Sequence, residues 1–339
     1  IKMSINFMLL FIFICFILLF FSKKFNFLLD IKKEKHKKFS SKQENYSIGG
    51  LLIICYLVLF YFIQNQFLYI LFFVSIFLIG FLSDLKMLNN PKKRFVLQAI
   101  VLYIFIHFLE IKISETRFIP LDNILNNLYF NHIFTVFCLM VLMNGSNFID
   151  GLNTLLINYI LLIFLILLTF FSSNILEAQI LENLILILLV ILFFNLSGKI
   201  ILGDSGSYLL SVFVGLYLIQ FAYQNNFISP FFVVLLLWYP CFELLFSMTR
   251  RLISKNEPYR PDISHLHQML FKIFQKKIKN KNNLNHFFSS SLINIYNFCS
   301  IIIGVQYYNH SKTLILIIII NLLIYCYFYR FLKNKLNSI

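Results

Sequence analysis

Residues 203–207, Gly-Asp-Ser-Gly-Ser, place a carboxylate among small residues at the start of a long apolar run. A glycine-rich turn that leads into a helix offers free backbone N–H groups to an anion such as phosphate. Asp204 would repel that anion unless a cation lay between them, and Mg²⁺ binds carboxylates together with substrate phosphates. We therefore predict a Mg²⁺–diphosphate site here, with Asp204 as a metal ligand and Lys199 as a substrate-binding residue.

Two further polar positions lie where apolar runs begin or end. Gly49 and Gly50 open one run, and paired glycines let a backbone or a ligand approach closely. We predict that they bind substrate, although a flexible helix start after a basic loop explains them equally well. Asp84 ends another run, where an acid costs free energy unless it is solvated or paired. It is a candidate catalytic residue, although solvation alone would also explain it.

A polar stripe extends from Asn144 to Thr154, with Asn147 and Asp150 at spacings that share one face of a helix. Such a stripe either bonds to a neighbouring helix or lines a binding site. The density of amides, acids and glycines favours a binding site. We predict Asn147 as a substrate-binding residue and Asp150 as an acid that serves catalysis or the metal.

A basic stretch in the last third of the chain holds arginines and histidines. Guanidinium groups bond to phosphate through two parallel N–H groups, so we predict that Arg250, Arg251 and Arg260 bind substrate. His265 and His267 can act as acids, phosphate donors or ligands and are candidate catalytic residues. A zinc site is disfavoured because no cysteine and no His-Glu-x-x-His pattern accompanies them.

The chain that carries these residues has 339 residues, of which 60% are hydrophobic and only 13% charged. Soluble globular proteins are less apolar and more highly charged. Runs of about 20 apolar residues without strand-type alternation predict helices that span a membrane. We predict an all-α polytopic membrane protein with about eleven transmembrane helices. The predicted spans are residues 4–22, 48–64, 67–83, 95–113, 128–145, 153–172, 180–197, 206–223, 229–248, 286–306 and 312–329.

The basic residues predict how these helices are oriented. Of the 29 Lys and Arg residues, all but Lys2, Lys112, Arg117 and Lys312 fall in connections on one side. Because basic connections face the cytoplasm, we predict an N-terminus outside and a C-terminus in the cytoplasm. The candidate site residues then share the cytoplasmic face of one domain, residues 1–339. Its predicted cytoplasmic loops are residues 23–47, 84–94, 144–153, 198–206 and 249–285.

The net charge of +15 follows mostly from this topology. The basic loops suit anionic lipid head groups, and without interleaved aromatic residues they do not indicate a nucleic-acid partner. The six cysteines lie in apolar runs without a C-x-x-C pair, which indicates buried thiols. Acids, arginines and histidines on the cytoplasmic face of a membrane protein predict an enzyme that joins a soluble anionic nucleotide to a membrane-embedded phosphate.

The same motifs occur in the order and spacing of a known family. Over essentially its whole length the chain resembles the bacterial polyprenyl-phosphate N-acetylhexosamine-1-phosphate transferases of glycosyltransferase family 4. The resemblance is carried by the Gly49-Gly50 pair, NxSNFIDGLN at 144–153, NLSGKIILGDSGS at 195–207, PCFE before Arg250-Arg251, and PDISHLH at 261–267.

The resemblance implies a reaction at the cytoplasmic face of the bacterial inner membrane. UDP-N-acetylhexosamine and undecaprenyl phosphate would give undecaprenyl-diphospho-N-acetylhexosamine and UMP, with Mg²⁺ or Mn²⁺ as cofactor. By position it implies that Asp204 is a metal ligand and that Asp84 is the second acid of a paired-aspartate motif. It also implies that Asn147 and Asp150 bind the nucleotide and its diphosphate. His265 and His267 correspond to a cytoplasmic histidine motif. His265-Leu266-His267 is similar to the branch that starts O-antigen and teichoic-acid linkage. The sugar and the pathway stay open, as does a homodimer.

The chain departs from the family pattern at three positions. Ser83 stands where the first acid of the pair is usual, Asn153 replaces an acid, and Glu243 stands where aspartate is common. Loss of the first acid need not stop the reaction, because a phosphate monoester with a second pKa near ~6 is mostly dianionic at neutral pH. Two alternatives stay open: a catalytically impaired relative with a binding role, and a transporter of polyprenyl-linked sugars.

Overall fold

The computed structural model describes residues 5–26, 28–29, 45–171, 175–254, 264–278 and 281–338. Within these ranges the chain forms helices and two isolated β-bridges, Leu29–Tyr46 and Tyr46–Ile200, and no longer strand. The helices are α1 (Ile5–Phe25), α2 (Gly49–Ile63), α3 (Phe67–Asp84), α4 (Pro91–Phe108), α5 (Ile119–Leu125), α6 (Leu128–Ile149), α7 (Leu155–Phe170), α8 (Ile175–Leu196), α9 (Gly203–Gln224), α10 (Pro230–Ile253), α11 (Leu266–Lys277), α12 (Asn282–Gln306) and α13 (Ser311–Asn337).

Each predicted span overlaps one of these helices, and α5 and α11 are additional short helices that the apolar pattern did not predict. In the described part of the chain, seven helices are long and apolar enough to cross a membrane: α3, α6, α8, α9, α10, α12 and α13. The helical, membrane-type fold is therefore confirmed. The number of about eleven spans and the sides on which the termini lie remain predictions.

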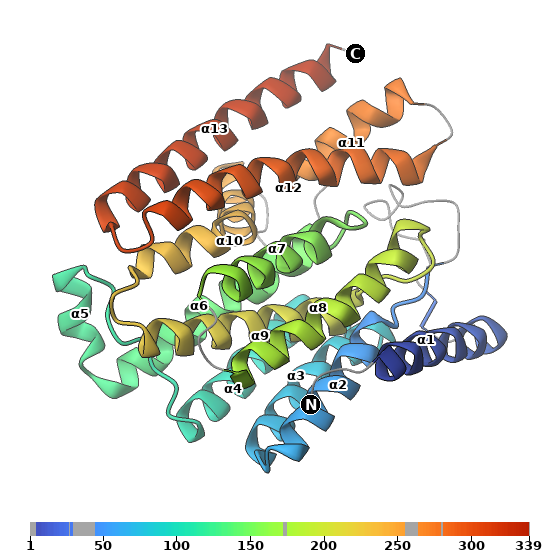
Figure 1. Ribbon diagram of the computed structural model, residues 1–339. Coiled ribbons are helices and arrows are strands. Elements are labelled where there is room, and N and C mark those ends of the chain that lie inside the picture. Colours follow the sequence, from blue (N-terminus) through green and yellow to red (C-terminus); the bar gives the residue numbers. More distant parts are fainter. Residues whose placement is uncertain are drawn as a thin grey trace.

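Helix α9 lies at the centre of the bundle. It packs against α2, α3 and α6, and 78% of its most apolar window is buried inside the protein. Helices α12 and α13 lie along one side of the bundle, whereas α2 and α3 lie along the other (Figure 1). An apolar helix that is buried on nearly all sides places its first turn among the ends of its neighbours. That first turn contains Asp204.

Local capping explains why α4 begins four residues earlier than predicted. The Asn90 side chain accepts hydrogen bonds from the backbone N–H groups of Lys92 and Lys93, and Pro91 occupies the first helical position. Asparagine is a strong N-cap, and proline suits this position because its missing N–H would be unpaired there anyway. As a result Arg94 lies in the first turn of α4 and not in a loop.

Glycines allow α2 and α3 to approach the first turn of α9. A Cβ atom added at Gly80 would lie 2.6 Å from the backbone nitrogen of Ser205, and one added at Gly50 would lie 2.7 Å from that of Gly206. Real Cβ atoms do not come this close to backbone, so only glycine fits at either position without a shift of the helices. The two glycines bring α9 within reach of side chains at the end of α3.

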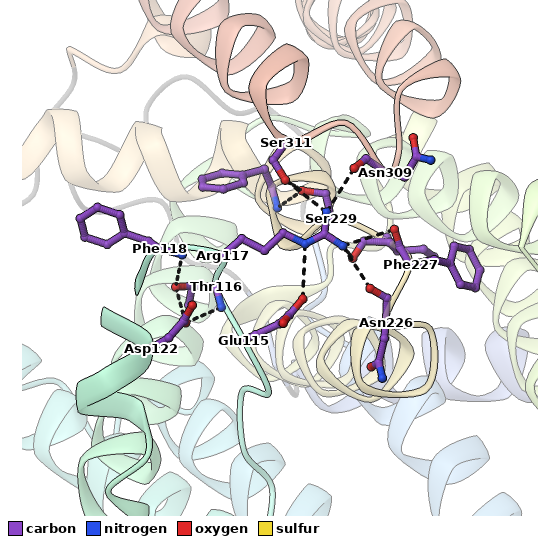
Figure 2. A network of polar contacts seen from close by, with 12 residues as sticks. Glu115, Thr116, Arg117, Phe118, Asp122, Asn226, Phe227, Ser229, Asn309 and Ser311 are labelled. Carbon is purple, nitrogen blue, oxygen red and sulfur yellow. Dashed lines mark hydrogen bonds and ion pairs between the residues drawn. The ribbon is translucent and has the colours of Figure 1, made fainter. Parts of the chain in front are cut away.

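At the opposite end of the bundle, Arg117 connects three loops (Figure 2). Its guanidinium group donates to the backbone carbonyls of Asn226 at 3.0 Å and Asn309 at 3.1 Å. It also donates to the Ser311 hydroxyl at 3.2 Å and to the Glu115 carboxylate at 3.3 Å. Arginine has five N–H donors in a fixed plane, which lets one side chain hold the α4–α5, α9–α10 and α12–α13 connections together.

We expect Gly80→Ala to destabilise the protein by about 1–3 kcal/mol, because the added methyl group meets backbone that cannot move without displacing α9. The thermal unfolding midpoint of the purified protein in detergent measures this loss. Gly151→Ala is the matched control, because its added Cβ would meet only ordinary contacts of 3.4 Å or more. Equal midpoints for the two variants would contradict the close approach of α3 and α9.

Candidate functional site

Asp84, the last residue of α3, caps the N-terminus of α9. Its carboxylate accepts hydrogen bonds from the backbone N–H groups of Asp204 at 2.9 Å and Ser205 at 3.1 Å, and from the Ser205 hydroxyl at 2.7 Å. Free N–H groups and the helix dipole favour an anion at this position. The sequence predicted that these N–H groups would be free to bind phosphate. In the structure the anion at this turn is the carboxylate of Asp84.

Asp204 points to a cation on a neighbouring helix. Arg94 donates from Nη1 to Oδ2 of Asp204 at 2.7 Å and to the Ser83 hydroxyl at 2.5 Å. The Ser83 hydroxyl in turn donates to the same Asp204 oxygen at 2.5 Å. Both charged side chains are about a quarter exposed, and such pairs contribute only about 0–1 kcal/mol to stability. The Arg94–Asp204 pair therefore contributes little to the stability of the fold, and both of its charges are accessible to a ligand.

The last turn of α6 lies against the first turn of α9. The Asn147 side-chain carbonyl accepts from the Ser207 hydroxyl at 3.0 Å, and its amide donates to the Tyr208 hydroxyl at 3.4 Å. The helix ends at Ile149, with Asp150 as its C-cap. Thr154 lies beyond the helix in a left-handed conformation and contacts the Ser290 hydroxyl at 2.6 Å. The predicted polar stripe is thus continuous as far as Asp150 and does not include Thr154.

A second polar cluster surrounds the histidines at the start of α11. Nδ1 of His265 bonds to Glu243 of α10 at 3.0 Å, and the Tyr325 hydroxyl of α13 donates to the other Glu243 oxygen at 2.7 Å. The ring of His267 stacks on that of His265 with centroids 5.5 Å apart. Glu243 is fully buried, so these partners offset the cost of burying its charge.

Phe148 joins the two clusters. It follows Asn147 on α6, and its ring lies 5.1 Å from the His265 ring and 5.6 Å from the Arg251 guanidinium carbon. An arginine above an aromatic ring is held in place by a cation–π interaction. The last turn of α6 thus contacts α9, which carries Asp204, through Asn147 and contacts the basic groups of α10 and the start of α11 through Phe148.

The structure thus brings together most, but not all, of the predicted site residues. Gly49 and Gly50 are buried and pack against the start of α9, so their close contact is with backbone. Lys199 is exposed in the loop before α9, and its carbonyl accepts from the Tyr46 N–H at 3.1 Å. Arg250 lies over the ring of Tyr329. Arg260 is outside the described residues.

Sequence reasoning missed Arg94 and the α9 partners of Asn147. Arg94 was counted only as a charge of a basic connection. The preceding Asn-Pro pair is a helix-start pattern that would have placed it on the first turn of a helix. Ser207 and Tyr208 had no such pattern, because their contact with Asn147 depends on how α6 and α9 pack.

The carboxylates fit a metal ion that arrives with its substrate. Asp84 uses both carboxylate oxygens at α9, whereas the described residues bond only Oδ2 of Asp204 and leave Oδ1 available. Across those same residues, no three His, Cys, Asp or Glu side chains converge on one metal position. Mg²⁺ often binds one or two carboxylates and completes its shell with water and phosphates. Asp204 suits that role, and Asp150, the other predicted ligand, lies at the end of α6.

Comparisons with known proteins agree with the resemblance drawn from the motifs. The family model described as glycosyl transferase family 4 matches residues 66–222, which include Asp84, Arg94, Asn147 and Asp204. The undecaprenyl-phosphate alpha-N-acetylglucosaminyl 1-phosphate transferase of Thermotoga maritima is 26% identical over 233 residues. That match covers 68% of this chain and 68% of the relative.

The pKa of His267 predicts how stability depends on pH. Burial lowers this pKa, the attraction of Glu243 opposes that effect, and the neighbouring His265 adds to it, which together leave the pKa at about 3. In the unfolded chain the His267 side chain takes up a proton near pH 6.5. In the folded chain this side chain stays neutral down to about pH 3. Stability is therefore fully present above pH 6.5 and is lost as the pH falls, by up to about 1.4 kcal/mol per pH unit.

We expect the stability of His267→Gln to fall less steeply with decreasing pH, because glutamine does not titrate. The measurement is the thermal unfolding midpoint in detergent between pH 7.5 and pH 5. His310→Gln, at an exposed histidine of the α12–α13 connection, should keep the slope of the unaltered protein. An unchanged slope in His267→Gln would show that other groups control the acid sensitivity.

Proposed function

We propose that the chain belongs to glycosyl transferase family 4, whose model matches residues 66–222, and that it transfers a UDP-linked N-acetylhexosamine 1-phosphate to undecaprenyl phosphate. The products are undecaprenyl-diphospho-N-acetylhexosamine and UMP. The name of the Thermotoga maritima relative supports the lipid acceptor and an N-acetylglucosamine donor. We place the reaction at the cytoplasmic face of the bacterial inner membrane, as the first membrane step of a cell-surface polysaccharide such as O-antigen.

The observation that carries this proposal is the contact between Arg94 and Asp204 at the start of α9. An accessible carboxylate beside a guanidinium group offers one ligand for Mg²⁺ and one planar donor for phosphate. When a diphosphate and Mg²⁺ bind, the Arg94–Asp204 ion pair would be replaced by two others, one between Arg94 and phosphate and one between Asp204 and Mg²⁺. When bound, Mg²⁺ would be held by Asp204, aided by Asp150, and would neutralise charge on the diphosphate.

The nucleophile is an oxygen of the lipid phosphate. It forms a bond to the β-phosphorus of the UDP-sugar, and the bond from that phosphorus to the bridging oxygen of UMP breaks. The lipid phosphate is mostly dianionic at neutral pH, since its second pKa is near ~6. Ser83 therefore need not act as a base. Its hydroxyl instead keeps the Arg94 guanidinium and the Asp204 carboxylate in register.

The second cluster binds the phosphates from the other side. Nδ1 of His265 bonds to Glu243, and in the imidazolium form both ring nitrogens donate, so that Nε2 can donate to a phosphate oxygen. Tyr325 holds Glu243 from the opposite direction and is thus a positioning residue. Arg251, held over Phe148, adds positive charge next to the histidines. Catalysis then rests on orientation and on charge neutralisation.

The test is UMP release by the purified protein in detergent, with UDP-N-acetylglucosamine and undecaprenyl phosphate as substrates. We expect Asp204→Asn and Arg94→Met each to lower the rate by about 100-fold or more, because each removes a charge that acts on the diphosphate. Glu115→Gln, at an exposed acid of the opposite end of the bundle, is the control and should keep the full rate. Full activity in Asp204→Asn, or no UMP with any UDP-N-acetylhexosamine, would refute the proposal.

A catalytically impaired relative is the second candidate, because Ser83 replaces an acid of the family pattern. Under the main proposal Ser83→Asp lowers the rate or leaves it unchanged, since a third carboxylate would compete for Arg94. A rate increase of about tenfold or more would instead indicate that serine impairs the natural chain. A transporter predicts movement of a polyprenyl-linked sugar across vesicles without UMP release.

A further inference from the structure

A cavity of about 1030 Å³ lies at the end of the bundle opposite to Asp84 and Asp204. Its walls come from the ends of α2, α4 and α9 and from the starts of α3 and α6. Gln220 and Gln224 line it near the end of α9, while Asp204 lies in the first turn of the same helix. At 1.5 Å per residue these positions are about 25–30 Å apart. The cavity is therefore separate from the site proposed for the transfer reaction.

The lining combines aromatic rings with amides. The Tyr61 ring stacks on that of Tyr69, with centroids 5.1 Å apart and planes 7° apart, and on that of Phe73 at 5.4 Å. Four glutamines add donors and acceptors at the exposed rim: Gln64, Gln66, Gln220 and Gln224. Aliphatic side chains such as Leu109, Ile111 and Leu216 complete the walls, so the cavity presents apolar surfaces together with polar groups at its rim, as pockets for small ligands do.

The charge of the lining argues against an ionic ligand. Among the described lining residues, the only acid is Glu110 and the only lysine or arginine is Lys112. Their charges are opposite and both side chains are exposed. A site for phosphate or a nucleotide would present several arginines or lysines, so a neutral ligand fits the lining best.

His132 supplies an independent sign of a missing ligand. Its side chain lines the cavity and is 1% exposed, yet neither ring nitrogen has a hydrogen-bond partner in the described part of the chain. The ring of His107 packs on it edge-on, with centroids 5.5 Å apart. A buried polar group without a partner costs about 1–3 kcal/mol. A neutral imidazole offers one donor and one acceptor, and a hydroxyl group can bond to either.

We propose that this cavity binds the ring of a neutral saccharide of the hexose or N-acetylhexosamine type. The C–H faces of a pyranose ring pack on flat aromatic side chains, and its hydroxyl groups bond to amides and to a neutral imidazole. The binding site would lie on the side of the membrane opposite to the transfer reaction. Its occupancy does not depend on that reaction.

The test is saturation-transfer NMR on the full chain, with N-acetylglucosamine and glucose as probes. The detergent must be zwitterionic, because alkyl maltosides carry saccharide head groups. We expect transfer to ring protons of at least one probe. The double variant Gln220→Leu/Gln224→Leu and the variant His132→Phe should each weaken binding by about tenfold or more, because each removes hydrogen bonds to hydroxyl groups.

Two controls distinguish this site from other surfaces. Gln306→Leu, at an exposed glutamine outside the cavity, and Asp204→Asn, at the other end of α9, should both leave saccharide binding unchanged. The proposal is wrong if neither probe shows saturation transfer. It is also wrong if Asp204→Asn abolishes the transfer while the double variant Gln220→Leu/Gln224→Leu leaves it intact. If native mass spectrometry shows a phospholipid retained by the unaltered protein and lost in His132→Phe, the ligand is a lipid head group and the proposal is wrong. If His132→Phe does not fold, the double variant Gln220→Leu/Gln224→Leu still tests the proposal, because both of its positions are exposed.

Discussion

The interaction on which the site depends is the capping of α9 by the carboxylate of Asp84. A helix with 78% of its apolar window buried has N-terminal N–H groups that water reaches poorly, and unpaired groups there would be costly. Asp84 supplies the missing acceptors from a residue 120 positions away in the sequence. The same bond fixes α3 to α9 and thereby sets Ser83 and Arg94 beside Asp204. Structural stability and the geometry of the charged site thus rest on one carboxylate.

This capping also explains the glycines. A side chain in α3 reaches the first turn of α9 only if the two helices nearly touch, and Gly80 removes the atom that would keep them apart. Gly50 does the same for α2. The paired glycines at the start of α2 were predicted to bind substrate, a role that stays open, while their contacts in the structure are with the backbone of α9. Close packing through small residues is typical of helices in membranes, where apolar burial alone does not hold helices together.

The sequence predicted the helices well because continuous apolar runs leave few alternatives in a membrane. It also predicted acids, arginines and histidines near one another, since every motif lies at a helix end on the basic side. It could not predict that the N–H groups of the Gly-Asp-Ser-Gly turn are already occupied by Asp84, or that Arg94 pairs with Asp204. Both contacts join positions more than 100 residues apart and depend on helix packing. The short amphipathic helix α11 was not predicted because polar and basic residues alternate with its apolar ones in the sequence and leave no continuous apolar run.

The single turn of α6 that carries Asn147 and Phe148 has a consequence for energetic coupling. Asn147 holds the α9 side and Phe148 holds His265 and Arg251, so neither cluster can shift without moving the backbone of the other. Residues that share one rigid element do not contribute independently, and the free energies of their substitutions do not add. The acids and the basic groups are therefore one thermodynamic unit, although they come from four different helices and the start of a fifth.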